Sequence, residues 1–530
     1  MPQKEMRHMI KGAAILTGAS LIVKILSAIY RVPFQNIVGD EGFYVYQQVY
    51  PIYGLAMTLA ASGLPQFISK YLAEAKTPAA EKNALQQLLP LLTGLSLLLW
   101  GIVFFGSGLI AHLMGDQALQ PLIQVVSFTF LLIPGLATYR GAFQSRLQMT
   151  PTAISQVVEQ VLRVGVILIA AFCFQQFAWD IYQTGTLAMV GAVVGGSLAL
   201  LLLHCYDRKL NRQSLELVDF VKIPAEKSTG LLGRFLLEGG LLSIYSGYLI
   251  LFQLVDAFFA KNSLVAQGLS QQAAKIDKGI FDRGQPLVQL GLVVATALSA
   301  SFLPILTRRL LAGNQGQFEK LARIYLRLSV SLAAAAALGL ALLTPLINFS
   351  LFKDHAGELT LTLFVLAVAL MGAIQAYQSI AQSENRFLPA LKAASVGLLI
   401  KIIATGPLTY YLGTVGTSLA TLLGLTATLL CFICFMPKKI NFFLREHQFG
   451  STLLKCLGIM GLTVGLLLVG IDFFQLAEKR WQALLWSVVS VAVGASSFIT
   501  AAVYWQLFTL REWLMFPLGE KILRLLKRGK

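Results

Sequence analysis

Long apolar runs constrain this chain more than any other feature of its sequence. Each run is continuous for about 20 residues, the length that crosses a bilayer as an α-helix, whereas the strands of a membrane barrel are about half as long and alternate in polarity. Of the 530 residues, 56% are hydrophobic and 13% are charged, against roughly 45–50% and 25% in soluble domains. The sequence therefore predicts an all-α polytopic membrane protein, and it excludes a soluble enzyme, a disulfide-stapled domain and a disordered chain.

The chain is expected to form about fourteen transmembrane helices. The first apolar run follows a basic N-terminus but is too long for a signal peptide and has no small-residue cleavage site, so we expect an uncleaved helix. The spans are expected near residues 10–33, 43–70, 86–112, 121–143, 152–174, 184–206, 231–259, 285–307, 324–350, 359–381, 388–410, 413–436, 451–474 and 482–509.

The distribution of basic residues predicts the orientation in the membrane. With the N-terminus inside, 31 of the 42 Lys and Arg fall in inner segments, 7 in outer gaps and 4 within spans. Cytoplasmic loops carry the excess of basic residues. We therefore expect a multi-pass protein of the bacterial plasma membrane with both termini in the cytoplasm. No basic run is interleaved with exposed aromatic residues, so nucleic acid is not an expected partner.

An internal repeat relates the first six spans to the next six. Features recur in span order at offsets of 234 to 239 residues, namely Pro65 and Pro304, the Gln-Ser pairs at 144–145 and 378–379, and the bases Arg163 and Lys401. Six spans per repeat give both copies the same topology, which is one of the transporter architectures. The sequence predicts two six-helix lobes related by the repeat, plus two extra C-terminal helices.

The expected domain boundaries follow from the spans and the repeat. They are 1–206 for the N-terminal lobe, 207–230 for a cytoplasmic linker, 231–437 for the C-terminal lobe, 438–450 for an interfacial segment, 451–510 for the last two helices and 511–530 for a cytoplasmic amphipathic tail.

Ionisable residues at bilayer depth are the candidate functional residues, because a charge in the membrane is costly unless it faces a cavity or a partner. The candidates for substrate binding are the bases Lys24, Arg31, Arg163, Arg283 and Lys401 and the acids Asp40 and Asp256. Their excess of positive charge suits an anionic substrate such as phosphate or pyrophosphate.

Each of these residues also has a structural interpretation. Arg31 could snorkel to the interface, Arg163 could neutralise Glu159 four residues before it, and Asp256 is expected to pair with one of the bases. The tyrosines Tyr44, Tyr46, Tyr50 and Tyr53 could form an interfacial belt or line a cavity that accepts sugars.

Other chemistry has little support in the sequence. The spacing of Cys431 and Cys434 lacks the second pair or the histidines of a metal site, and no phosphate-binding G-x-x-x-x-G-K-[ST] motif occurs. No cofactor and no metal are expected, and ion coupling or the membrane potential would drive transport.

Several motifs together resemble the SpoVB-type polysaccharide transporters, which lie beside the MurJ lipid II flippases in the multidrug/oligosaccharidyl-lipid/polysaccharide exporter superfamily. They are the segments at 38–42, 50–53, 63–70, 139–141, 151–163 and 282–286. The resemblance implies two lobes around a central cavity, with the helices of 451–510 forming a groove for a polyprenyl tail. It also implies functional roles for Lys24, Arg31 and Arg283, which match basic residues of the flippases. Lys24 and Arg31 are spaced one residue wider than the matching pair in the Gram-negative members, and the first base is Lys rather than Arg.

The expected function is that of a flippase without enzymatic activity. It would move an undecaprenyl-pyrophosphate-linked sugar, lipid II or a related cell-wall intermediate, from the inner to the outer leaflet by alternating access. The expected partners are this lipid-linked oligosaccharide, membrane lipids and cell-wall synthesis enzymes. A drug/cation antiporter of the same superfamily, a membrane-embedded polysaccharide polymerase or glycosyltransferase and a non-transporting scaffold stay open as alternatives.

Overall fold

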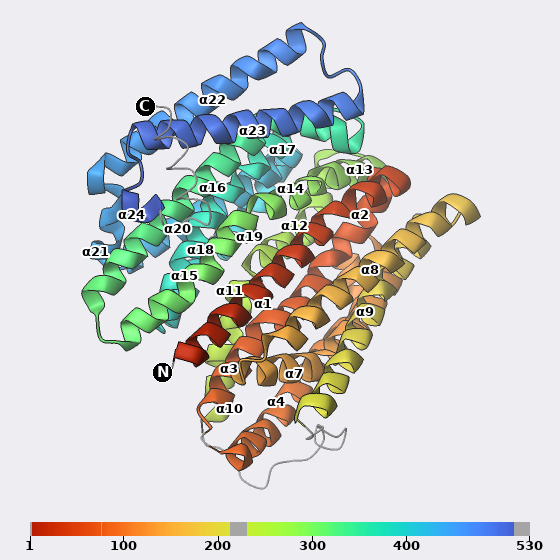
Figure 1. Ribbon diagram of the computed structural model, residues 1–530. Helices are drawn as coiled ribbons and strands as arrows, with labels where there is room; N and C mark the ends of the chain where they lie inside the picture. The colour runs from red at the N-terminus through yellow and green to blue at the C-terminus, as the bar shows by residue number, and fades with distance from the viewer. Residues whose placement is uncertain (1–2, 76, 212–229, 514–530) are drawn as a thin grey trace. The chain divides into compact units, whose positions relative to one another are not determined.

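The computed structural model describes residues 3–75, 77–211 and 230–513. All regular secondary structure in these residues is helical (Figure 1). Thirteen stretches of the described chain are long and apolar enough to cross a membrane. The prediction of an all-α polytopic membrane protein is confirmed, whereas the count of fourteen helices stays a prediction.

The first of the thirteen stretches, Ile15–Ala73, covers two of the expected spans. As one straight helix, its 59 residues would extend roughly 90 Å, about three times the hydrocarbon core of a bilayer. The stretch includes most of α1 (Gln3–Ile29) and all of α2 (Arg31–Thr58), and the helical geometry of α2 is broken at Gly39, where φ is 71° and ψ is −178°. A residue with a Cβ atom rarely adopts this conformation, so glycine allows the break.

The chain divides into two compact units. Unit 1 comprises residues 1–286 and 398–420, and unit 2 comprises residues 287–397 and 421–530. Residues 231–286, which the repeat assigns to the C-terminal lobe, pack within unit 1. The lobe boundaries derived from the repeat stay a prediction. Of the expected linker and tail, residues 212–229 and 514–530 lie outside the described part of the chain.

Unit 1 contains all seven candidate residues. After α1 and α2 its elements are η1 (Leu59–Gly63), α3 (Leu64–Ala73), α4 (Pro78–Phe105), α5 (Ser107–Leu113), η2 (Gln117–Leu119), α6 (Gln120–Leu131), α7 (Ile133–Ser145), α8 (Met149–Phe177), α9 (Ile181–Asn211), α10 (Leu231–Arg234), η4 (Phe235–Gly239), α11 (Gly240–Ser246), α12 (Tyr248–Gln267) and α13 (Gln271–Asp282). Parts of α14 (Gly284–Gly291), α19 (Phe387–Leu412) and α20 (Thr414–Phe435) also belong to it.

Helix α2 forms the centre of unit 1. It packs against α6, α8, α9, α12 and α13, and most of its residues from Gly42 to Gly54 are buried. Helices α8 and α9 lie side by side (Figure 1). A Cβ atom at Gly195 of α9 would lie only 2.6 Å from the carbonyl oxygen of Glu159 on α8, so glycine permits this close approach, which holds the polar face of α8 in place.

Unit 2 is built around the long helix α16 (Gln315–Phe352), which packs against α15, α18, α22 and α23. Its other elements are α15 (Val293–Leu311), α17 (Glu358–Val365), α18 (Ala367–Ser383), α21 (Lys438–Asn441), η5 (Phe442–Leu444), η6 (Glu446–Gln448), α22 (Phe449–Phe473), α23 (Arg480–Tyr504) and α24 (Leu510–Trp513). A buried ion pair between Arg327 and Glu512, 3.5 Å apart, joins α16 to α24. The expected interfacial segment 438–450 contains the short helices α21, η5 and η6 and the first residues of α22.

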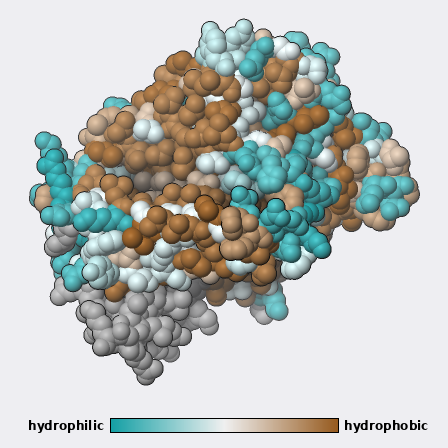
Figure 2. Space-filling view, turned by 90° about the horizontal axis from the view of Figure 1, so that it is seen from above, coloured by the Kyte–Doolittle hydropathy of each residue, from teal (hydrophilic) through white to brown (hydrophobic). Residues whose placement is uncertain are grey.

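Apolar side chains are widely exposed on the surface. Brown areas of apolar residues in Figure 2 alternate with separate teal areas of hydrophilic ones. Phe105 and Phe473 are each 78% exposed, and Leu454 is 70% exposed. Soluble proteins rarely expose so many large apolar side chains, so these surfaces are suited to lipid.

Candidate anion-binding site

Two arginines in unit 1 lie within candidate membrane-spanning stretches and have no carboxylate partner among the described residues. Arg31 begins α2 and is fully buried, and none of its three guanidinium nitrogens has a hydrogen-bond partner in the described chain. Arg163 on α8 donates one bond of 2.9 Å to Gln160, while its Nε and Nη1 atoms are buried without a partner. Five guanidinium nitrogens of these two arginines therefore have no hydrogen-bond acceptor among the described residues.

Tyrosine rings surround both guanidinium groups. The Arg31 group lies 4.5 Å from the centre of the Tyr50 ring and 5.9 Å from that of Tyr30. The Arg163 group lies 4.5 Å from Tyr53, 5.4 Å from Tyr30 and 5.9 Å from Tyr50. The two arginines thus share the faces of Tyr30 and Tyr50, and cation–π attraction offsets part of the cost of burying the charges.

The rings of this cluster are held by one another. Tyr30 and Tyr46 share a hydrogen bond of 2.8 Å between their hydroxyl groups, and the Tyr46, Tyr50 and Tyr53 rings follow in contact along α2. All of these residues are buried. The interpretation of the α2 tyrosines as an interfacial belt is therefore wrong. We call Arg31, Arg163, Tyr30, Tyr46, Tyr50 and Tyr53 the arginine–tyrosine cluster.

Glu159 and Arg163 do not form the ion pair that their four-residue spacing on α8 suggested as an alternative. The carboxylate of Glu159 accepts a 2.7 Å bond from Arg140 of α7 instead, and Arg140 also donates to Ser155 and to the carbonyl of Ala60. Arg140 was missed because counting along the sequence places it at the inner end of a span. The tertiary pairing of α7 with α8 leaves Arg163 without a carboxylate partner in the part of the chain that the structure describes.

Two of the predicted bases are neutralised by the two predicted acids. The guanidinium group of Arg283 forms two bonds to the carboxylate of Asp40, of 2.8 and 2.5 Å. The ammonium group of Lys401 donates to the carboxylate of Asp256, and both side chains are buried. The expected pairing of Asp256 with one of the bases is confirmed.

A further buried ion pair escaped the sequence analysis. Lys278 of α13 donates to both carboxylate oxygens of Asp282, at 2.6 and 2.7 Å. The four-residue spacing on one helix could have indicated it. Lys24 lies on α1 with a half-buried side chain, and its role in binding stays a prediction.

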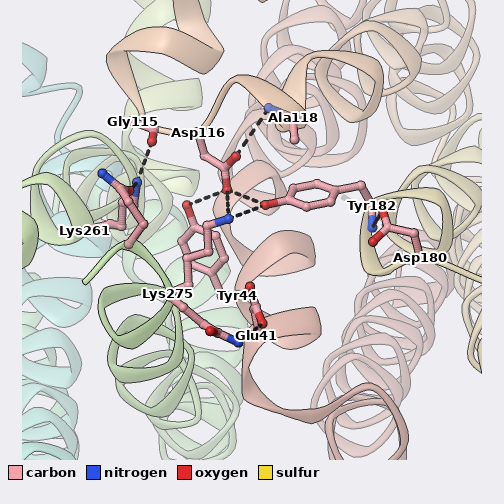
Figure 3. Close-up of polar contacts among 11 residues, drawn as sticks. Glu41, Tyr44, Gly115, Asp116, Ala118, Asp180, Tyr182, Lys261 and Lys275 are labelled. Carbon is pink, nitrogen blue, oxygen red and sulfur yellow. Dashed lines mark hydrogen bonds and ion pairs between the residues drawn. The ribbon is translucent and has the colours of Figure 1, made fainter. Parts of the chain in front are cut away.

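A second polar cluster lies around Asp116, between α5 and η2 (Figure 3). The carboxylate of Asp116 accepts bonds from Tyr182 at 2.8 Å and Tyr44 at 3.4 Å, and Lys275 of α13 lies 3.2 Å away. Lys261 of α12 donates to the carbonyl of the adjacent Gly115. These contacts attach the ends of α12 and α13 to α2, α9 and the loop after α5.

An apolar cavity of about 430 Å³ also lies within unit 1. Leucine, isoleucine, valine and phenylalanine side chains from α2, α4, α11 and α12 form most of its wall, with residues of η1, α3, α5, α6 and η4 completing it. Ile52 of this wall directly precedes Tyr53 of the arginine–tyrosine cluster. The apolar cavity and the arginine–tyrosine cluster thus both include residues of α2.

The described residues hold no group of three His, Cys, Asp or Glu side chains that could bind a metal ion. What the site offers is two guanidinium groups with unused donors, in surroundings of low polarity. Guanidinium groups form strong paired hydrogen bonds with phosphate oxygens. The arrangement is chemically suited to bind an anion that bears phosphate groups.

Curated relatives match nearly the whole chain. The uncharacterized membrane protein YabM of Bacillus subtilis (strain 168) is 32% identical, with 98% of this chain and 97% of YabM covered. In the same organism, the lipid II flippase MurJ is 24% identical, with coverage of 93% and 94%, and stage V sporulation protein B is 25% identical, with coverage of 83% and 86%.

Solved structures show the same fold. The lipid II flippase MurJ in an inward closed conformation has a TM-score of 0.66 and 14% identity, with 93% of this chain and 99% of that chain covered. An inward-facing multidrug resistance MATE family transporter has a TM-score of 0.62 and 13% identity, with coverage of 80% and 96%. The resemblance to SpoVB-type and MurJ-type transporters is confirmed. A family model described as "Polysaccharide biosynthesis protein" matches residues 9–309, more than half of the sequence, and the chain belongs to this family of membrane proteins.

Proposed function

We propose that this protein is a flippase for an undecaprenyl-pyrophosphate-linked sugar, either lipid II or a related precursor of the cell wall or of a polysaccharide. It would move this lipid from the inner to the outer leaflet by alternating access, making and breaking no bond. The family membership and the relatives named MurJ and stage V sporulation protein B support transport of a lipid-linked precursor.

The observation that carries the proposal is the arginine–tyrosine cluster. An unpaired buried charge costs several kcal/mol, yet Arg31 and Arg163 both lack a carboxylate among the described residues. A pyrophosphate group would supply the missing negative charge and accept bonds from the unused nitrogens. The cluster is therefore better explained as a site awaiting an anion than as a structural ion pair.

The lipid part of the substrate would stay in apolar surroundings. The apolar cavity on α2 supports a ligand with a hydrocarbon portion. We also propose that α22 and α23, within residues 451–510, bind the polyprenyl tail, since both helices expose large apolar side chains such as Leu462, Leu466 and Val488.

The proposed location is the bacterial plasma membrane, with both termini in the cytoplasm and with cell-wall synthesis enzymes as partners. A reporter fused after Lys530 should therefore be cytoplasmic, and one inserted at 260–284 should be external. A cytoplasmic signal from the 260–284 insertion would contradict this orientation.

The described carboxylates lend little support to a drug/cation antiporter. Asp40, Glu159, Asp256 and Asp282 each pair with a basic side chain, whereas a cation site needs an acid that is available to the drug. No observation favours a polymerase or glycosyltransferase.

The test is lipid II accessibility at the outer leaflet of flippase-depleted cells that express variants of this protein. Arg31→Ala and Arg163→Ala should lose the activity while the protein still accumulates in the membrane. Arg309→Ala removes an exposed arginine and should keep it. Wild-type activity in both Arg31→Ala and Arg163→Ala would refute the proposal.

A further inference from the structure

A stripe of buried polar side chains on α8 leads to Arg163. Gln156, Gln160 and Arg163 are spaced by four and three residues, so they lie on one face of the helix. The backbone of this turn packs closely against α9, because a Cβ atom at Gly191 would lie only 3.0 Å from the carbonyl oxygen of Arg163. The polar side chains therefore project from a turn that is held in place by its neighbour.

Gln160 differs from the polar residues beside it. Glu159 is ion-paired, and Nε2 of Gln156 donates a 3.3 Å bond to the carbonyl of Ala61. Oε1 of Gln160 accepts the 2.9 Å bond from Nη2 of Arg163. Nε2 of Gln160 is buried and has no acceptor among the described residues, so half of this amide is unused.

The orientation of the Gln160 amide follows from its contact with Arg163. A guanidinium group can only donate hydrogen bonds, so the atom that faces it must be the carbonyl Oε1, and Nε2 points elsewhere. Nε and Nη1 of Arg163 are also buried without an acceptor in the described chain. A buried donor without an acceptor costs free energy, so these three nitrogens together indicate a ligand that accepts hydrogen bonds.

The lack of charge on Gln160 matters as much as its amide. A Glu three residues before Arg163 would have nearly the same shape and would form a helical ion pair with it. Gln160 supplies the same acceptor oxygen but leaves the positive charge of Arg163 uncompensated. A phosphate group offers several strong acceptor oxygens, so it can accept hydrogen bonds from both residues at the same time.

We propose that Gln160 is a binding residue of the anion site in the arginine–tyrosine cluster. Its Oε1 orients Arg163 without neutralising it, and its Nε2 donates a hydrogen bond to a phosphate of the bound headgroup. The inference rests on the proposed function, since it assigns the headgroup to that cluster. A neutral donor beside the charged ones adds directional hydrogen bonding to the electrostatic attraction.

The experiment compares two substitutions of Gln160 that differ in charge. The full-length protein in nanodiscs would be titrated with farnesyl pyrophosphate as the probe. Gln160→Met removes the amide and should weaken binding by about 10- to 150-fold, the loss typical of one hydrogen bond to a charged group. Gln160→Glu gives Arg163 a carboxylate and places a negative charge in the site, so it should bind the probe more weakly than Gln160→Met.

The thermal midpoints without the probe should follow a different order. Gln160→Glu compensates a buried cation, so its midpoint should equal or exceed that of wild type. Gln160→Met leaves Nη2 of Arg163 without its acceptor, so its midpoint should be lower. If Gln160 had only a structural role, the less stable variant would be the weaker binder. Gln175→Glu makes the same change at an exposed position of α8 and should bind the probe as wild type does.

The possible failures are distinguishable. If wild-type protein binds the probe and both Gln160 variants bind it as tightly, or if neither variant accumulates in the membrane, this inference is wrong while the proposed function stands. Tighter binding by Gln160→Glu than by Gln160→Met would also overturn it. If wild-type protein does not bind the probe, or if Arg163→Ala binds it as tightly as wild type, the anion site itself is refuted, and the inference fails with it.

Discussion

The guanidinium group of Arg283 and the carboxylate of Asp40 form a bidentate ion pair between residues 243 positions apart in the chain. Gln35 donates a further 2.9 Å bond to the same carboxylate. The turn between α13 and α14 is thereby attached to α2, just after the break at Gly39. Arg283 was predicted to bind substrate, but its charge in this structure is already compensated.

We expect Arg283→Ala to destabilise the protein, because it leaves the Asp40 carboxylate partly buried with one neutral donor. The loss should be about 3 kcal/mol of unfolding free energy, as for other broken buried pairs. It would be measured as a lower thermal midpoint in detergent. The exchange Asp40→Arg/Arg283→Asp should recover part of the loss, and an unchanged midpoint in Arg283→Ala would contradict a structural role for this pair.

Arg140 and Arg163 should differ in stability, although both are buried arginines of adjacent helices. Arg140→Met leaves Glu159 as an uncompensated buried charge and should cost about 3–5 kcal/mol. Arg163→Met removes a cation that has no carboxylate partner among the described residues, so it should leave stability unchanged or raise it. Thermal unfolding of the two variants gives the comparison, and equal destabilisation of both would refute the assignment of Glu159 to Arg140.

Gly115 should tolerate no side chain. Its φ is +78°, and a Cβ atom would lie 1.9 Å from Oδ1 of Asn262, so Gly115→Ala combines backbone strain with a clash. We expect a loss of about 1–3 kcal/mol and faster cleavage by protease at the loop after α5. Gly115→Ala/Asn262→Ala should recover only the part due to the clash, because the backbone strain persists. Gly94 has no atom within 4 Å of its Cβ position, so Gly94→Ala is the control.

The pair of Glu74 and Arg234 should make a small, pH-dependent contribution to stability. Hydrogen bonds from Arg234 hold the pKa of Glu74 below its usual value. The contribution is therefore present above the unfolded-state pKa of about 4.3 and is lost as pH falls through the lower folded-state pKa. Thermal midpoints of wild type and Glu74→Gln should converge under acid conditions, and a difference that grows on acidification would contradict this sign.

The fold was largely predictable, because hydropathy and chain length determine where helices cross a membrane. The break at Gly39 was harder to predict from the sequence, because the residue lies in a short polar gap whose backbone geometry depends on packing. The repeat pointed to Arg163 and Lys401 as matched charges, and both side chains are buried. The repeat could not indicate that Lys401 forms an ion pair with Asp256, whereas Arg163 packs against tyrosine rings.

The partners of charged residues were the least predictable part of the site. Spacing along one helix correctly suggests Lys278 with Asp282 but wrongly suggests Arg163 with Glu159. Neighbours from another helix compete for the same carboxylate, and Arg140 of α7 lies closer. Such competition depends on how two helices are rotated against each other, which a single sequence does not specify.

The break at Gly39 separates two charged groups that belong to different contacts. Arg31 of the arginine–tyrosine cluster lies before it, and Asp40, which binds Arg283, lies directly after it. Within α2, Gly39 is the residue with non-helical backbone angles, so its φ and ψ angles set the direction of one helical segment relative to the other. A rotation about the φ and ψ bonds of Gly39 would change the separation of Arg31 and Asp40 without unwinding either helical segment. Loading of the anion site and release of the Asp40–Arg283 contact can in this way be parts of a single movement.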